Sequence, residues 1–217
     1  MTIRRTRRWY GFRRAVRPCY GSDVTEWNRT PKRVADSQVT LVQLMEITDA
    51  NIAGIVHGGV VMKLVDTAAG LAAIKHCGGL AVTVSMDSMS FLAPVHVGDT
   101  ITVKASVNAA YTTSLEVGVQ VEAERIVTGE RLHASSAYLV FVALDEEGRP
   151  RPIPPVVAET VVQQRRQREA TIRRETRMEH RRAIEQHRQE VAAVETANPA
   201  VRAETPDDGS SPPHLRI

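Results

Sequence analysis

The period of the hydrophobic positions changes along this chain, and each change predicts an element. Between residues 39 and 47 apolar residues recur at every second position, with Gln43 as the exception, which predicts a strand. Its apolar face carries Val39, Leu41, Met45 and Ile47. Residues 57–76 are apolar on almost every side and rich in Ala, which predicts a buried helix. Gly78 and Gly79 are typical of the end of such a helix.

Four strand-like runs follow this helix. From Val82 apolar residues alternate with polar ones, and the phase shifts before Met89, as a bulge would cause. Residues 101–108 and 115–124 alternate regularly, whereas residues 132–144 are apolar on both faces, which predicts a central strand. Consecutive long strands joined by short turns predict an antiparallel sheet, and the apolar helix is expected in its concave face. This α+β arrangement, a curved antiparallel sheet wrapped around a central helix, is the hotdog fold.

The two ends of the chain differ in composition from its middle. Residues 1–17 hold seven Arg and no acid, and we interpret residues 1–33 as a basic, disordered arm. Residues 34–156 form the predicted folded domain. Residues 157–196 predict a polar helix rich in Arg and Glu, and residues 197–217 a disordered tail.

Several classes of protein are excluded by composition. The two cysteines, Cys19 and Cys77, are too few for a disulfide framework and lack the spacing of metal ligands, so we expect no metal and a cytoplasmic protein. No apolar run reaches the roughly 18 residues that a membrane helix needs. The basic arm lacks the apolar segment of a secretion signal. We therefore expect no membrane span.

One carboxylate, Asp66, interrupts the apolar helix. Burying an ionised carboxylate without partners is costly, so its position needs a reason. In a structural interpretation, Asp66 makes a hydrogen bond or pairs with Lys63, three residues earlier. In a functional interpretation, it is a general base or a nucleophile in a cleft.

The entrance of the same helix is the second candidate feature. Gly58 and Gly59 follow His57, and glycines at a helix start leave backbone N–H groups open to an anion or a developing oxyanion. His57 either orients the turn or acts as a base. Asn51, on the preceding loop, either holds a water or a carbonyl group or is a turn residue.

Taken together, these features are more specific. Residues 49–70, DANIAGIVHGGVVMKLVDTAAG, closely resemble the acyl-CoA hydrolases of the cytosolic and brain type. The resemblance continues through Lys75-His76-Cys77, the run 85–91, the turn 94–99 and Ala134-Ser135-Ser136-Ala137, and covers roughly residues 36–180.

The resemblance implies a function and an assembly. In that family hotdog domains pair, and water attacks the thioester with the help of an Asn before the central helix and an Asp on it. These positions match Asn51 and Asp66. The resemblance thus implies an acyl-CoA substrate, fatty acid and CoA as products, and no cofactor apart from the CoA of the substrate. It also implies a homo-oligomer, with the dimer as minimal unit and a trimer of dimers as the expected assembly.

Helix geometry independently favours a site shared by two chains. Asp66 lies about 12 Å along the helix axis from its own Gly58, at about 1.5 Å per residue. A base must come within about 3 Å of the water that it activates. We therefore expect Gly58 and Gly59 of one chain to polarise the thioester carbonyl. Asn51 of that chain and Asp66 of the other then activate water, or Asp66 attacks directly through an anhydride.

Three other functions compete with this one. A hotdog dehydratase or hydratase acting on enoyl-CoA or acyl-ACP would use His57 as its base. A nucleic-acid-binding protein would use the Arg-rich ends, but nine Arg of residues 160–190 are interleaved with five Glu, so we expect no nucleic acid partner. A domain that binds acyl-CoA without turnover would not need both Asn51 and Asp66.

Overall fold

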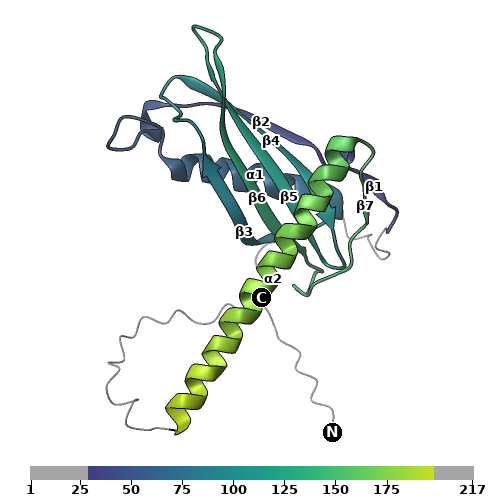
Figure 1. Ribbon diagram of the computed structural model, residues 1–217. Coiled ribbons are helices and arrows are strands. Elements are labelled where there is room, and N and C mark those ends of the chain that lie inside the picture. The colour runs from purple at the N-terminus through teal and green to yellow at the C-terminus, as the bar shows by residue number, and fades with distance from the viewer. Residues whose placement is uncertain (1–28, 198–217) are drawn as a thin grey trace. The chain divides into compact units, whose positions relative to one another are not determined.

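The computed structural model describes residues 29–197 (Figure 1). The chain divides into two compact units, one ending at Ala170 and one beginning at Thr171. The elements, in chain order, are β1 (Lys32–Arg33), the 3-10 turn η1 (Val34–Ser37), β2 (Val39–Leu44), the 3-10 turn η2 (Ile47–Asp49), α1 (Gly58–Cys77), β3 (Ala81–Phe91), β4 (Asp99–Ala110), β5 (Ser114–Arg125), β6 (Arg131–Ala143), β7 (Val156–Val157) and α2 (Val161–Ala197).

The predicted antiparallel sheet is confirmed. Its five strands lie in the order β2-β4-β5-β6-β3, and every neighbouring pair is antiparallel. Strand β6 lies inside the sheet, as its apolar faces predict, whereas β3, within residues 29–197, pairs with β6 alone and forms an edge. The predicted bulge in β3 is present, because the register shifts between Thr83 and Ser85 and again between Met86 and Ser88.

The core lies between α1 and one face of this sheet. Helix α1 contacts all five strands and runs behind β4, β5 and β6 in Figure 1. Its buried side is made mostly of Val and Ala, whose small side chains let the helix lie close to the strands. The fully or almost fully buried residues of α1 and of the facing strands include Val65, Ala68, Ala69, Ala72, Ile101, Val103, Val107, Leu115, Val117, Leu139 and Phe141.

Two sequence predictions about burial are wrong for the single chain. Helix α1 is not covered on every side, since Met62, Asp66 and Leu71 are exposed. Burial within the single chain thus does not explain why Met62 and Leu71 are apolar. Ile47, predicted on the buried face of the first strand, lies instead in η2 and is exposed, because β2 ends at Leu44.

The last carbonyl groups of α1 are held by two cations from distant segments. Lys32, predicted to belong to the disordered arm, lies in β1, which pairs with β7, and its Nζ donates to the carbonyl oxygens of Lys75 at 3.1 Å and His76 at 2.8 Å. Arg151, almost fully buried, donates from Nη2 to the Cys77 carbonyl at 3.1 Å. Positive charge at a helix C-terminus is stabilising. The predicted glycine end is confirmed, since Gly78 has a φ of 68°.

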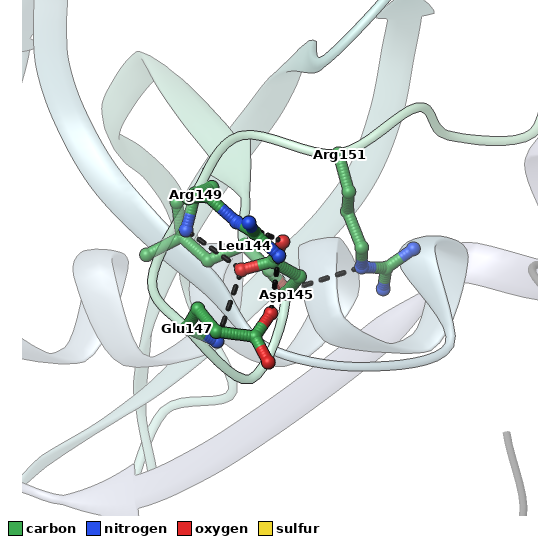
Figure 2. A network of polar contacts seen from close by, with 5 residues as sticks. All are labelled: Leu144, Asp145, Glu147, Arg149 and Arg151. Atoms are coloured by element: carbon green, nitrogen blue, oxygen red, sulfur yellow. Dashed lines mark hydrogen bonds and ion pairs between the residues drawn. The ribbon is translucent and has the colours of Figure 1, made fainter. Parts of the chain in front are cut away.

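A tight turn after β6 positions Arg151. Figure 2 shows Asp145 accepting hydrogen bonds from the backbone and the side chain of Arg149, and Glu147 pairing with the same guanidinium. Arg151 points to the other side and donates from Nε to the Leu144 carbonyl at 3.1 Å.

The predicted polar helix is present as α2, which begins at Val161. Its first ten residues belong to the same unit as the sheet, where Tyr111 Oη donates to the carbonyl of the buried Ala170 at 3.3 Å. The remaining residues of the predicted arm and tail, 1–28 and 198–217, lie outside the described part of the chain. Among residues 29–197, no helix combines the length and the apolar character that crossing a membrane requires.

Candidate functional site

The carboxylate of Asp66 lies on the exposed face of α1 and is held by a residue of the sheet. Thr83 Oγ1, from the edge strand β3, donates to Asp66 Oδ1 at 2.7 Å. Within residues 29–197, Oδ2 of Asp66 has no hydrogen-bond partner, and no ion pair joins Asp66 to Lys63. Of the structural interpretation, the ion pair with Lys63 is absent, whereas a hydrogen bond is present, from Thr83. The second carboxylate oxygen is left open to a bound molecule.

The entrance of α1 is organised by His57. This residue is the N-cap, and its Nδ1 accepts a hydrogen bond from the Gly59 amide at 2.9 Å. The proton of the neutral ring must then lie on Nε2. The Gly59 amide is consequently not open, in contrast to the expectation from sequence. The Gly58 amide is different, because nothing in the described part of the chain accepts its proton.

Each glycine of this entrance has a steric reason. A Cβ on Gly59 would lie 2.9 Å from His57 Nδ1, too close for the cap to form. A Cβ on Gly58 would lie 3.3 Å from the ring of Phe91, the last residue of β3. Phe91 thus borders the open Gly58 amide with an apolar ring, a role that sequence reasoning did not assign.

Asn51 belongs to the loop that leads into the helix. Its Oδ1 accepts from the Ala53 amide at 2.8 Å, so the turn interpretation of this residue is correct as far as the oxygen is concerned. The loop is closed by a hydrogen bond from the Asn51 amide to the Ile55 carbonyl at 2.8 Å. The half-buried Asn51 side chain still has its Nδ2 amide group, which is a donor.

The structure does not bring all the predicted site residues together within one chain. Asn51, His57 and Gly58 cluster at the N-terminus of α1, whereas Asp66 lies two turns further along, about 12 Å along the axis. Asp66 faces outward, beside the exposed Met62. Within residues 29–197, no group of three or more His, Cys, Asp or Glu side chains could hold a metal ion.

Comparison with known proteins places this arrangement in a family. Residues 53–130 match the thioesterase superfamily model. An uncharacterized acyl-CoA thioester hydrolase of Bacillus subtilis is 39% identical over 125 residues, which cover 58% of this chain and 73% of the relative. The chain belongs to the thioesterase superfamily. Its similarity within that superfamily is to acyl-CoA thioester hydrolases. The cytosolic acyl coenzyme A thioester hydrolase of Mus musculus is 37% identical over 64% of this chain, which spans only 37% of that relative's length.

Solved structures agree with this placement. An acyl-CoA hydrolase from Staphylococcus aureus, in complex with butyryl coenzyme A and coenzyme A, has a TM-score of 0.68 and 34% identity, covering 74% of this chain and 98% of that one. A hexameric acyl-CoA thioesterase has the same TM-score and identity, over 70% of this chain and 97% of that one.

Three further structures of the Staphylococcus aureus enzyme are single alanine variants of an Asn, an Asp and a Thr. Those three positions are separated by 15 and 17 residues. Asn51, Asp66 and Thr83 have the same separations, 15 and 17 residues, in this chain. The hydrogen bond between Thr83 and Asp66 thus joins two positions of that pattern, and the sequence prediction included only one of them.

Proposed function

We propose that this chain hydrolyses acyl-CoA thioesters to a free acid and CoA, in an active site shared by two copies. The observation that carries the proposal is the Asp66 carboxylate, which is held through one oxygen by Thr83 on an exposed helix face. The matching separations of Asn51, Asp66 and Thr83 support it. The similarity to cytosolic acyl coenzyme A thioester hydrolases supports a cytosolic location. Hydrolysis requires no cofactor apart from the CoA of the substrate.

The reaction follows from the donors and acceptors of the site. The Gly58 amide donates to the thioester carbonyl and stabilises the oxyanion that forms when water attacks. Asn51 Nδ2 of the same chain orients the water or the carbonyl. Asp66 of the second chain removes the proton from the water. The carbon–sulfur bond then breaks, and the CoA thiolate leaves and takes up a proton. The direct route, in which Asp66 attacks and an anhydride is hydrolysed, uses the same residues.

His57 has a supporting role in this mechanism. Its Nδ1 caps the helix by accepting from the Gly59 amide, which leaves Nε2 as the ring's donor and no free lone pair to act as a base. A dehydratase or hydratase that depends on His57 to remove a proton from carbon is disfavoured for this reason. An assay that follows both free thiol release and enoyl-CoA hydration separates the two functions.

The first test replaces the proposed base. Asp66→Asn keeps the size of the side chain and an oxygen for Thr83, so the fold should persist while turnover falls by about 10²-fold or more, the usual effect of losing a base. Thiol release is measured with acyl-CoAs of several chain lengths, and a correctly assembled variant with near-normal turnover would contradict the role of Asp66.

The second test asks whether two chains share the site. Asn51→Ala and Asp66→Ala chains should each be nearly inactive alone. Random exchange makes about half of the dimers mixed, and each mixed dimer has one intact site, so activity should return to about a quarter of wild type. Mass-tagged subunits show that exchange has occurred. No recovery after demonstrated exchange would mean that each site lies within one chain, while thioester hydrolysis would still stand.

A further inference from the structure

A polar groove lies on the outer face of the sheet, the face that points away from α1. Along β4, the buried core residues Val103, Ala105 and Val107 face α1. Because successive side chains of a strand point to opposite faces, Lys104 and Ser106 lie on the outer face. Figure 1 shows α1 behind the strands and the first turns of α2 in front of them, so the start of α2 covers part of this outer face.

The strand register brings polar residues of four strands into two neighbouring rows. The paired residues of the first row are Thr40, Lys104, Gln120 and Ser136, and those of the second row are Ser106, Gly118 and Tyr138. These rows form the floor of a groove of about 440 Å³, hereafter the outer groove, whose wall is made by Arg165, Arg166 and Glu169 of α2. The outer groove is thus built by the sheet and the helix together.

The floor of the outer groove is shaped at Gly118, in the middle of β5. A Cβ at this position would lie 2.5 Å from Asn108 Nδ2, so the Asn108 side chain requires a glycine beside it. Asn108 is itself held by Glu116, because its Nδ2 donates to Glu116 Oε1 at 3.0 Å and both residues are buried. This end of the floor is therefore fixed by the fold.

Ser106 supplies a hydroxyl group that the fold does not use. The residue is only 8% exposed and lines the outer groove. Within residues 29–197, its Oγ makes no hydrogen bond, and it is not sealed off from the groove. Polar groups on buried residues are normally hydrogen-bonded, so the Ser106 hydroxyl is placed to bond a molecule in the groove.

Arg166 supplies a cation that the fold does not neutralise. Its neighbours on the groove are paired, since Lys104 Nζ lies 2.6 Å from Glu122 Oε2 and Arg165 Nε lies 3.7 Å from Glu169 Oε1. Arg166 is half-buried and has no ion-pair partner in the described part of the chain. A guanidinium binds a phosphate group through two parallel hydrogen bonds, which favours an oxyanion at this point of the groove.

We propose that the outer groove binds a small, hydroxyl-rich organic phosphate, with Arg166 on the phosphate and Ser106 on a hydroxyl group. Sites for apolar ligands are lined mostly by apolar and aromatic side chains. The outer groove is instead lined mostly by hydroxyl, amide and charged groups, which both donate and accept hydrogen bonds, as sugar hydroxyl groups do. Its volume lies within the range of about 300–1,000 Å³ that is usual for small-molecule sites.

The outer groove is separate from the proposed thioester site within one chain. Asp66 lies on α1, on the other side of the sheet, and neither Asp66 nor Asn51 lines the groove. The inference therefore goes beyond the proposed function and does not depend on it. A ligand that contacts both Ser106 and Arg166 joins the sheet to the start of α2, so its binding also stabilises the folded chain.

The test is calorimetric titration of the full chain with glucose-6-phosphate. We expect saturable binding by wild type, weakened at least about tenfold in Arg166→Gln because a charge-assisted hydrogen bond is lost, and about threefold in Ser106→Ala. The matched control is Arg168→Gln, which removes an exposed guanidinium of the same helix that donates to the Gln164 carbonyl, and it should bind like wild type. Inorganic phosphate, which lacks hydroxyl-bearing carbons, should bind at least about tenfold more weakly than glucose-6-phosphate.

Each other outcome would overturn the inference. No saturable binding by wild type at millimolar ligand, or equal binding by Arg166→Gln, would do so directly. Inorganic phosphate that binds as tightly as glucose-6-phosphate would show an anion contact only. Displacement of bound glucose-6-phosphate by CoA would assign the groove to the phosphates of the substrate. A changed number of chains in sedimentation of Arg166→Gln would assign the groove to a contact between chains.

A second variant keeps the test decisive if Arg166→Gln does not fold, as judged by circular dichroism. Arg166→Lys keeps the positive charge but loses the two parallel donors of the guanidinium. It must then weaken binding of glucose-6-phosphate relative to Arg168→Lys, which makes the same change at the control position. Equal binding by these two variants would also overturn the inference.

Discussion

His76, in the last turn of α1, predicts a specific loss of stability in mild acid. Its side chain is fully buried, and Nε2 donates to the Pro154 carbonyl at 2.9 Å. Within residues 29–197, Nδ1 has no partner. Burial lowers the pKa of His76 below its ordinary value of 6.5, and the nearby positive charge of Lys32 lowers the pKa further. The Pro154 carbonyl and the Asp36 carboxylate act in the opposite direction and raise the pKa. The folded protein thus holds a neutral ring.

The sign of the effect follows from proton counting. In the unfolded chain the imidazole takes up a proton near pH 6.5, whereas in the folded chain it does so only at a lower pH. Between these two values the unfolded state binds one proton more than the folded state. The free energy of unfolding therefore decreases as the pH falls through this window, by at most about 1.4 kcal/mol per pH unit from this one group.

His76→Gln isolates this contribution, because the Gln amide can replace the Nε2 donor but does not titrate. We expect the wild type to lose stability more steeply than His76→Gln below pH 6.5, with parallel behaviour above it. His187→Gln, which removes an exposed imidazole from α2, is the matched control. Urea unfolding is measured at a fixed chain concentration, since assembly also affects stability. Wild-type and His76→Gln curves that stay parallel between pH 6.5 and pH 5 would refute the reasoning.

Two further predictions concern Thr83 and Cys77. Thr83→Val keeps the shape of the side chain but removes the hydroxyl that holds Asp66, so kcat for thiol release should fall by about tenfold with little change in the urea midpoint. The control is Thr67→Val, which removes a hydroxyl bonded to the Lys63 carbonyl within α1 and should leave kcat nearly unchanged. Burial raises the pKa of Cys77 to about 11, so in a Cys19→Ser background a thiol reagent at pH 8 should label the urea-unfolded chain and not the native one. Rapid labelling of the native protein would contradict this burial.

The sheet and the helix were predictable because each leaves a local periodic signal. The alternation along β4 and β5, the phase shift in β3 and the glycine after α1 all follow from neighbouring residues. What was mispredicted depends on contacts remote in sequence. The exposed side of α1 carries the apolar Met62 and Leu71 among charged and polar residues, and composition does not show whether these two pack within one chain or against a second.

The candidate site was predictable in part for the same reason. Asp66 is conspicuous because it is a carboxylate among apolar residues, whereas Thr83 is an ordinary strand residue until the fold brings it to Asp66. The cap on Gly59 also escaped prediction, because a histidine N-cap is not a frequent signal. Finding Thr83 from sequence would have required knowing which strand lies at the edge of the sheet.

The position of β3 at that edge has a consequence for the order of folding. The β4–β5 and β5–β6 pairs are hairpins that close through short turns, but β3 must find β6 across a long stretch of chain, from Ala81 opposite Ala143 to Phe91 opposite Ser135. Strand β2 pairs with β4 across a still longer stretch, from Val39 opposite Ala105 to Leu44 opposite Thr100. Closing such long loops costs more chain entropy, so we expect the hairpins to form first and the edge strands β2 and β3 to dock after them. Thr83 is carried on one of these late strands, and the hydrogen bond that holds Asp66 would therefore form only after the hairpins are in place.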